Sequence, residues 1–135
     1  MRLIYLLATL AACVVAATTS ATASAAATCP GTFEGAVTHG PNAGLVFSGP
    51  IVVTVGDDGT ITGTLVNNDG TVVPIGGFVA GNSIHLVFDL GENGTVRGVG
   101  DLVGNDFATC TGTATGSLHG PTLQDTGNWG IVWGS

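Results

Sequence analysis

The sequence contains no lysine, and its only basic side chains are those of Arg2 and Arg97. Against them stand nine aspartates and glutamates, all at or beyond Glu34, and the formal net charge is −7. Proteins that bind nucleic acids or anionic membranes do so through clusters of basic side chains, because these displace the counterions of the phosphates. The composition therefore argues against a nucleic-acid partner and against binding to an anionic membrane surface.

Long hydrophobic stretches are also missing, apart from one near the N-terminus. An uncharged run rich in leucine and alanine extends from Leu3 to Ala17 after Arg2, which is too short to span a bilayer comfortably and is typical of a secretory signal peptide. Small-residue cleavage sites of the A-x-A type follow it. We therefore expect residues 1–27 to be a signal peptide and residues 28–135 to form a single secreted, extracellular domain.

Leu10-Ala11-Ala12-Cys13 offers a second interpretation of the leader, because it resembles the lipobox that precedes the acylated cysteine of bacterial lipoproteins. A lipid anchor at Cys13 would hold the protein at the cell envelope. The apolar run continues beyond Cys13 and the stretch before it is short, so an ordinary cleaved signal is favoured over the anchor.

Cysteine is scarce, with three in the whole chain, and Cys13 would be lost with the leader. The remaining pair, Cys29 and Cys110, has no C-x-x-C spacing that would indicate a redox or metal site. In an oxidising compartment such a pair most simply forms one disulfide.

The sequence also lacks any segment favourable to a helix. All 23 glycines lie at or after Gly31, and a glycine costs about 1 kcal/mol in a helix interior. Short β-branched runs between turn residues instead predict strands. We expect eight of them, at residues 32–39, 45–55, 60–66, 72–80, 83–90, 95–103, 107–118 and 126–133.

Three turns share one sequence pattern: Asp58-Gly59-Thr60, Asp69-Gly70-Thr71 and Asn93-Gly94-Thr95. In each, the glycine would supply the positive φ of a tight hairpin turn and the threonine would begin the returning strand. Short connections force successive strands to pair antiparallel. The sequence therefore predicts an all-β fold, an eight-stranded up-and-down barrel, with a two-sheet β-sandwich as the alternative.

The faces of the strand at 45–55 are ambiguous. If Asp58-Gly59 is a two-residue turn, Val52 faces Leu65, and Ile51 and Val53 lie on the opposite face, so both faces are apolar. Either the register slips at a bulge, or another subunit or an extracellular protein partner covers the outer surface. Self-association is therefore a candidate, since so few surface charges oppose it.

Turn and breaker residues refine the strand ends. Pro50 and Pro74 are expected at bulges, kinks or unpaired edges, because proline has no N–H for a ladder. Pro74 and the neighbouring Gly76-Gly77 predict a break in the strand at 72–80. Gly104-Asn105 predicts a turn before the strand at 107–118.

Six aromatic side chains are the large groups available either to fill the barrel core or to line a ligand site: Phe47, Phe78, Phe88, Phe107, Trp129 and Trp133. The histidines are fewer. His39 and His119 occur in matching His-Gly-Pro sequences that should lie at one end of the barrel, whereas His85 lies in mid-strand. A three-histidine zinc site would need a different fold, so we expect exposed turn histidines, no metal and no cofactor.

Catalytic motifs are absent as well. No G-x-S-x-G elbow is present, and no pair of carboxylates is placed for acid and base work. The sequence therefore favours a non-enzymatic protein over an enzyme.

The arrangement resembles the small secreted barrels of the lipocalins and avidins. It has an early Gly31-Thr32-Phe33, where lipocalins have Gly-x-Trp, then a meander of hairpins and a last strand that carries Trp129 and Trp133. The resemblance implies a barrel whose mouth or interior holds a small apolar ligand, and it carries over no binding residues. Two functions are therefore expected: first an extracellular interaction or structural role, and as the alternative a binding module for a small apolar ligand.

Overall fold

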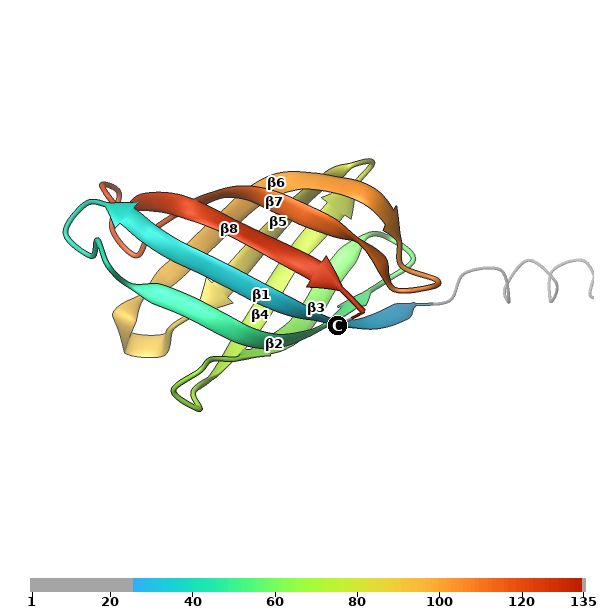
Figure 1. Ribbon diagram of the computed structural model, residues 1–135, viewed down its shortest axis with the longest axis horizontal. Helices are drawn as coiled ribbons and strands as arrows, with labels where there is room; N and C mark the ends of the chain where they lie inside the picture. Colours follow the sequence, from blue (N-terminus) through green and yellow to red (C-terminus); the bar gives the residue numbers. More distant parts are fainter. Residues whose placement is uncertain (1–25, 135) are drawn as a thin grey trace, which may run out of the picture.

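The computed structural model describes residues 26–134, which form an all-β fold (Figure 1). Cys13 and all but the last two residues of the expected signal peptide lie outside the described residues. The elements are β1 (Ala27–His39), β2 (Val46–Val55), β3 (Thr60–Val66), β4 (Val72–Ala80), β5 (Ser83–Asp89), the short 3-10 helix η1 (Gly91–Asn93), β6 (Thr95–Asp106), β7 (Thr111–His119) and β8 (Thr126–Trp133).

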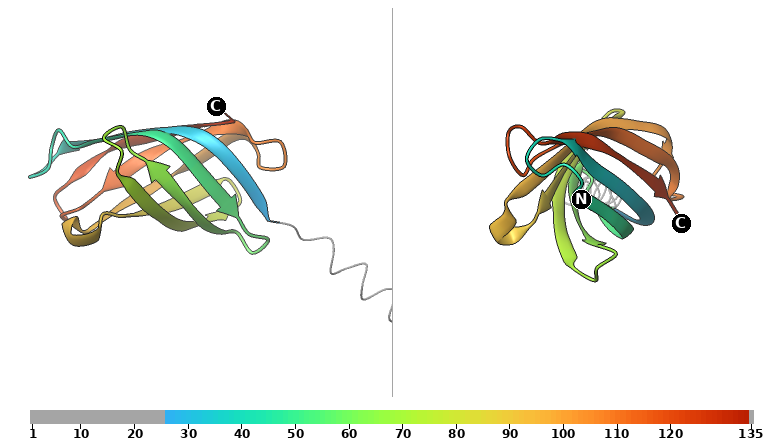
Figure 2. Two further views of the ribbon diagram at one scale, coloured as in Figure 1. Left: turned by 90° about the horizontal axis from the view of Figure 1, so that it is seen from below. Right: turned by 60° about the vertical axis from the view of Figure 1, so that its left-hand side comes forward.

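The strands form one closed barrel in which each pairs antiparallel with its neighbour in the sequence. Closure is made by β1 and β8, whose ladder runs from the Gly31–Trp133 pair to the His39–Thr126 pair. Figure 2 shows the strands winding obliquely around a common axis. The eight-stranded up-and-down barrel predicted from the sequence is confirmed, and the sandwich alternative is wrong.

The turn between β2 and β3 settles the faces of β2. Gly59 has a φ of 87°, and it closes a four-residue turn in which its N–H donates to Gly56 O at 3.0 Å. A turn of this kind inserts one more residue than a two-residue hairpin. Ile51 therefore lies opposite Leu65, not Val52 as the two-residue turn predicted. The register slip at a bulge is therefore observed, and Val52 lies on the outer face, where it is 44% exposed.

A turn of the same kind closes the β3–β4 hairpin, with Gly70 at positive φ. The β5–β6 connection contains η1, and Gly94 follows it, also at positive φ. An aspartate before the glycine reinforces the first two turns. Asp58 and Asp69 accept hydrogen bonds from the backbone N–H groups of Thr60 and Thr71, at 3.0 and 2.8 Å. These bonds stabilise the carboxylates and lower the pKa of both aspartates.

The predicted turn at Gly104-Asn105 is wrong. β6 continues to Asp106 past a register shift after Val103, and the chain turns over residues 107–110 instead. The side chain of Asp106 accepts a hydrogen bond from Ala108 N at 2.9 Å, and this contact starts the turn at Asp106. Gly104 has positive φ within β6. Cys110 consequently lies in the turn and not, as expected, in a strand.

Each of the two prolines lies in a strand that pairs with two neighbours, at a position just outside the ladder with one of them. The β2–β3 ladder begins at Ile51, next to Pro50, and the β4–β5 ladder begins at Ile75, next to Pro74. On that side the proline faces no ladder partner, so the N–H that proline lacks removes no hydrogen bond between the strands. The predicted break in β4 is wrong, because this placement leaves the strand continuous from Val72 to Ala80.

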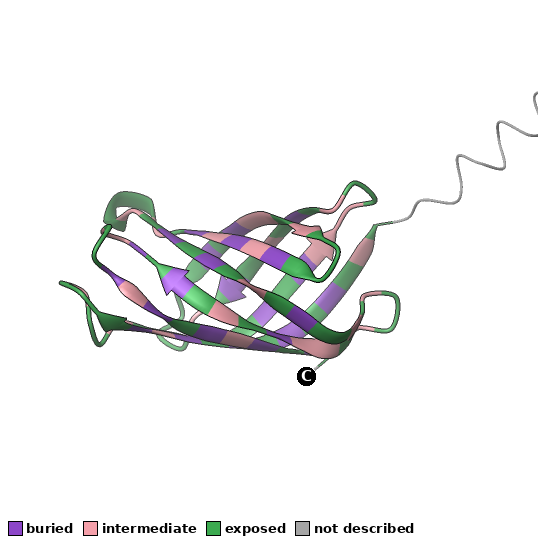
Figure 3. Ribbon diagram, turned by 90° about the horizontal axis from the view of Figure 1, so that it is seen from above, coloured by how far each residue is buried: buried purple, intermediate pink, exposed green. Residues whose placement is uncertain are grey.

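Buried and exposed residues alternate along the strands (Figure 3). The middle of the barrel is filled by Phe33, Phe88 and Trp129. The ring centroid of Phe33 lies 5.0 Å from that of Phe88 and 6.1 Å from that of Trp129. The indole N–H of Trp129 donates to Ser117 O at 3.0 Å. Glycine makes room for these rings, since a Cβ at Gly98 would lie 2.9 Å from Trp129 Nε1.

The two ends of the barrel differ. At one end the Cys29–Cys110 disulfide joins β1 to the β6–β7 turn, as the sequence predicted. The ring of Phe107 packs edge-on against Trp133 nearby, with centroids 5.4 Å apart. We call this the disulfide end. The opposite end carries the β1–β2, β3–β4, β5–β6 and β7–β8 loops (Figure 1), and we call it the open end.

Candidate functional site

The open end contains a hollow of about 800 Å³ to which all four of its loops contribute. The apolar side chains of Leu45, Phe47, Val73 and Leu90 contribute to its lining. Phe47 and Val73 are buried and belong to the core, whereas Leu45 and Leu90 are half-buried and pack against it. The hollow is thus an outward continuation of the hydrophobic core.

Polar side chains from the loops complete the lining of this hollow: Asn42, Asn67, Asp69, Thr71, Asp89, Asn93 and Thr122. Two of them form hydrogen bonds that order the open end. The Asn67 side-chain oxygen accepts from Ser48 N at 2.9 Å, and Asp89 accepts from Gly91 N at 2.8 Å. The charged members, Asp69 and Asp89, are both acidic. This arrangement suits an uncharged ligand, or a cationic one, with an apolar body.

A buried carboxylate holds two of the loops together. Asp125 is 0% exposed. It accepts hydrogen bonds from the backbone and side-chain nitrogens of Asn42 at 2.8 and 2.7 Å. It also accepts from the backbone N–H and hydroxyl of Thr122 at 2.9 and 2.8 Å. Burial raises the pKa of Asp125, but these bonds outweigh it and lower the pKa to about 2.

The Asp125 contacts predict an acid-sensitive open end. A carboxyl whose pKa is lowered on folding contributes stability above its unfolded value of about 3.9, and this is lost as the pH falls through about 2. We expect Asp125→Asn to lower the melting temperature at pH 7 by on the order of 10 °C. The difference from the wild type should shrink towards pH 2. Thermal unfolding followed by circular dichroism across this range measures both effects, and a difference independent of pH would contradict the assignment.

A second candidate surface lies on the outside of the barrel wall. Two adjoining hollows, of about 760 and 670 Å³, share Thr115, Asn128 and Trp129 and together extend from β5 and β6 across β7, β8 and β1 to β2. We call them the outer groove. One outward-facing row of cross-strand neighbours runs along it, made up of Ser83, Asp101, Thr115, Gly130, Glu34 and Ser48.

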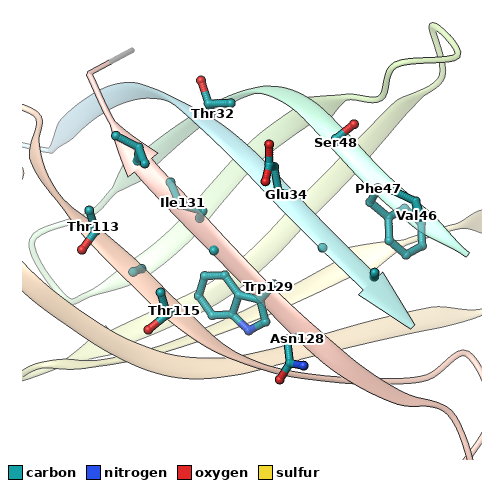
Figure 4. Close-up of a pocket in the computed structure, with 15 residues that line it drawn as sticks. Thr32, Glu34, Val46, Phe47, Ser48, Thr113, Thr115, Asn128, Trp129 and Ile131 are labelled. Atoms are coloured by element: carbon teal, nitrogen blue, oxygen red, sulfur yellow. The ribbon is translucent and has the colours of Figure 1, made fainter. Parts of the chain in front are cut away.

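The next outward-facing row on each side also lines the outer groove. Val99, Ser117, Asn128, Ala36 and Val46 belong to one of these rows, and Thr113, Val132 and Thr32 belong to the other. Figure 4 shows Thr32 and Glu34 on β1, Asn128 on β8, and Thr113 and Thr115 on β7 around the middle of the groove. Half of the fourteen residues named here carry a hydroxyl or amide group, and the surface that the larger hollow exposes is mainly apolar.

The structure separates the six aromatic residues singled out from the sequence. Phe88, Trp129 and Trp133 are buried in the core, Phe107 packs against it, and Phe47 is buried beneath the open-end hollow. The expectation that Phe78 helps to fill the core is wrong. Phe78 is 48% exposed on the outside of β4, where it stacks on His85 with ring centroids 4.4 Å apart.

Phe33 is the core residue that the list of aromatic candidates missed. It is 0% exposed and contacts two of the aromatic rings at the centre. The period of two along β1 could have found it, because Cys29, Phe33 and Val37 fall on one face and all are buried. Phe78 was assigned inward from its size alone.

The histidines lie as the sequence predicted. His39 and His119 are both paired with Thr126, on either side of it, so they occupy one cross-strand row at the open end. His85 lies on the far side of the barrel, against Phe78. Within residues 26–134, no three His, Cys, Asp or Glu side chains are grouped so that they could hold a metal ion.

No protein-family model matches the chain, and a search of curated proteins finds no significant relative. Among residues 26–134 there is no helix of the length and apolar character needed to cross a bilayer. The functional argument for the two candidate surfaces therefore rests on their geometry and chemistry alone.

Proposed function

We propose that this chain is a non-enzymatic, secreted binding domain that holds a small ligand with an apolar body in the open-end hollow. The observation that carries the proposal is the hollow of about 800 Å³ that continues the hydrophobic core outward between four loops. Hollows of this size at the mouths of β-barrels are a frequent place for small ligands.

The chemistry of the lining supports a particular class of ligand. Leu45 and Leu90 are half-buried, so they keep apolar surface that a ligand would cover. Asp69 and Asp89 would repel an anionic headgroup, whereas the amides of the rim suit neutral polar atoms. The favoured ligand is therefore apolar with a neutral or cationic polar end.

The disulfide supports the extracellular part of the proposal. Disulfides persist in oxidising compartments and are rare in the reducing cytosol. Cys29 and Cys110 are joined, so the domain suits secretion or, if Cys13 carries a lipid, the outside of the cell envelope.

Fluorescence titration with N-phenyl-1-naphthylamine, an uncharged apolar probe, tests the proposal. We expect saturable binding to the wild type, and Leu90→Gln should weaken it by about tenfold because the probe loses an apolar contact. Val79→Gln is the matched control, since Val79 is also half-buried against the core but lies near the disulfide end. Its binding should stay within about twofold of the wild type.

Two results would contradict a ligand site at the open end. One is an absence of saturable binding by the wild-type protein. The other is an equal loss of affinity in Leu90→Gln and Val79→Gln, because that would show that the substitutions act through general stability.

The second candidate is the extracellular interaction role, and the outer groove favours it. It crosses several strands on the outside of the wall, away from the open-end loops, and combines apolar and hydrogen-bonding groups.

A further inference from the structure

The polar groups that line the open-end hollow are unequally divided between hydrogen-bond donors and acceptors. Asp125 accounts for part of this, because it is 0% exposed and takes hydrogen bonds from two residues of the lining. The hydroxyl of Thr122 donates to Asp125 Oδ2 at 2.8 Å, and the side-chain nitrogen of Asn42 donates to the same oxygen at 2.7 Å. A hydroxyl has a single hydrogen, so Thr122 is left with lone pairs alone, and Asn42 keeps its side-chain oxygen and one N–H. Asp125 therefore shifts this side of the rim towards acceptors.

Two carboxylates add acceptors from the β3–β4 and β5–β6 connections. Asp69 precedes β4 and Asp89 ends β5, and both line the hollow. Asp69 Oδ1 accepts from Thr71 N and Asp89 Oδ1 accepts from Gly91 N, both at 2.8 Å. A carboxylate has two oxygens and can accept about four hydrogen bonds. Both side chains therefore keep negative charge and acceptor capacity for a ligand.

No basic side chain balances these charges within the hollow. Arg97 is the one lysine or arginine of residues 26–134. It lies on the outside of β6, opposite Val87 and His119, and is not part of the lining. Asn67 and Asn93 contribute amide donors to the lining, but these are uncharged. A ligand in the hollow therefore meets negative charge without a positive counterpart.

These features distinguish ligands by their polar end. A protonated primary amine has a positive charge and three N–H donors, and the rim offers acceptors for both the charge and the hydrogens. A carboxylate has a charge of the same sign as Asp69 and Asp89. A quaternary ammonium group has the positive charge but no N–H, and an alcohol has one donor and no charge. Charge and donor count together therefore favour the primary amine.

We propose that the ligand of the open-end hollow is a primary amine with an apolar body, whose ammonium group is attracted to the carboxylates of Asp69 and Asp89. Its apolar part covers the half-buried side chains of Leu45 and Leu90. The inference rests on the proposed function and narrows the ligand to one chemical class.

Displacement of N-phenyl-1-naphthylamine by four octyl compounds tests the proposal. Octylamine, octyltrimethylammonium, octanol and octanoate have the same chain and differ in the polar end. We expect octylamine to displace the probe at about tenfold lower concentration than octanol or octyltrimethylammonium, at pH 7 and low salt. Octanoate should be the weakest of the four. The preference for octylamine over octanol should decrease in about 0.5 M salt, because salt screens the charges of the exposed carboxylates.

Asp69→Asn/Asp89→Asn removes both charges and keeps a side-chain oxygen that can accept the backbone hydrogen bonds. We expect octylamine to bind this variant about tenfold more weakly than the wild type, and octanol to bind within about twofold. Asp57→Asn/Asp58→Asn is the matched control. It removes the same charge from the β2–β3 turn at the disulfide end, and Asp58 lies in the same Asp-Gly-Thr turn sequence as Asp69. This variant should keep the preference of the wild type for octylamine.

The outcomes separate this inference from the proposed function. If the probe does not bind the wild type, both are wrong. If the probe binds, but octanol or octanoate displaces it as readily as octylamine does, the ligand site stands and the amine class is wrong. Equal displacement by octyltrimethylammonium would overturn the primary amine, because charge without N–H donors would then suffice. An equal loss of octylamine binding in the two double variants would overturn the role of Asp69 and Asp89, because the preference would then arise from the net charge of the domain.

Discussion

Loss of the Cys29–Cys110 disulfide is expected to lower the free energy of unfolding by about 4.5 kcal/mol. The two cysteines are 81 residues apart in the sequence, and the chain-entropy model assigns this value to a loop of that length, as an upper figure. Domains of this size have a total stability of about 5–15 kcal/mol. Urea denaturation of the Cys29→Ala/Cys110→Ala double variant and the oxidised wild type measures the difference.

Reduction provides the control for this prediction. A thiol reductant should shift the unfolding midpoint of the wild type to that of the double variant, and should leave the double variant unchanged. A difference below about 1 kcal/mol would show that the unfolded chain is already restricted without the disulfide.

Phe33→Ala is expected to destabilise the barrel by about 3–5 kcal/mol. The ring is 0% exposed and lies between Phe88 and Trp129 at the centre. Its removal loses the transfer free energy of the ring and leaves a cavity that the closed wall cannot easily collapse to fill. The unfolding free energy from urea titration gives the magnitude, and near-ultraviolet circular dichroism should report the loosened environment of Trp129.

Phe78→Ala is the matched control for this substitution, because it removes the same side chain from the outside of β4. We expect a change within about 1 kcal/mol, since 48% of Phe78 is exposed. Equal destabilisation by the two substitutions would contradict the assignment of Phe33 to the core and Phe78 to the surface.

The fold could be predicted from the sequence because the turn chemistry is explicit. Gly59, Gly70 and Gly94 mark hairpins that force a meander, and the positive φ expected of each glycine is observed. The strands at 60–66, 72–80 and 126–133 were predicted with their observed ends. The disulfide followed from the count of cysteines.

The errors arose where one residue changes the register. The sequence Asp58-Gly59 does not reveal whether the turn has two or more residues, and that one residue decides whether Ile51 or Val52 faces inward. The turn at residues 107–110 was misplaced for a related reason, because the Asp106 side chain forms a turn further along than Gly104-Asn105 indicates.

The candidate surfaces were less accessible to sequence reasoning than the fold. The open-end hollow combines residues from four loops, such as Asn42 and Asn93, that become neighbours only when the barrel closes. The outer groove joins Asp101 to Glu34 through β7 and β8.

The Asp125 contacts have a consequence for the seam between the first and last strands. Asp125 precedes β8, and Asn42, which it binds, follows β1. The carboxylate therefore links the first and last strands at the open end. At the disulfide end Gly134 N donates to Pro30 O at 2.7 Å, and the neighbouring Cys29 forms the disulfide with Cys110. The junction between the first and last strands, whose pairing has the largest entropic cost in a meander, is therefore stabilised by additional bonds at both of its ends.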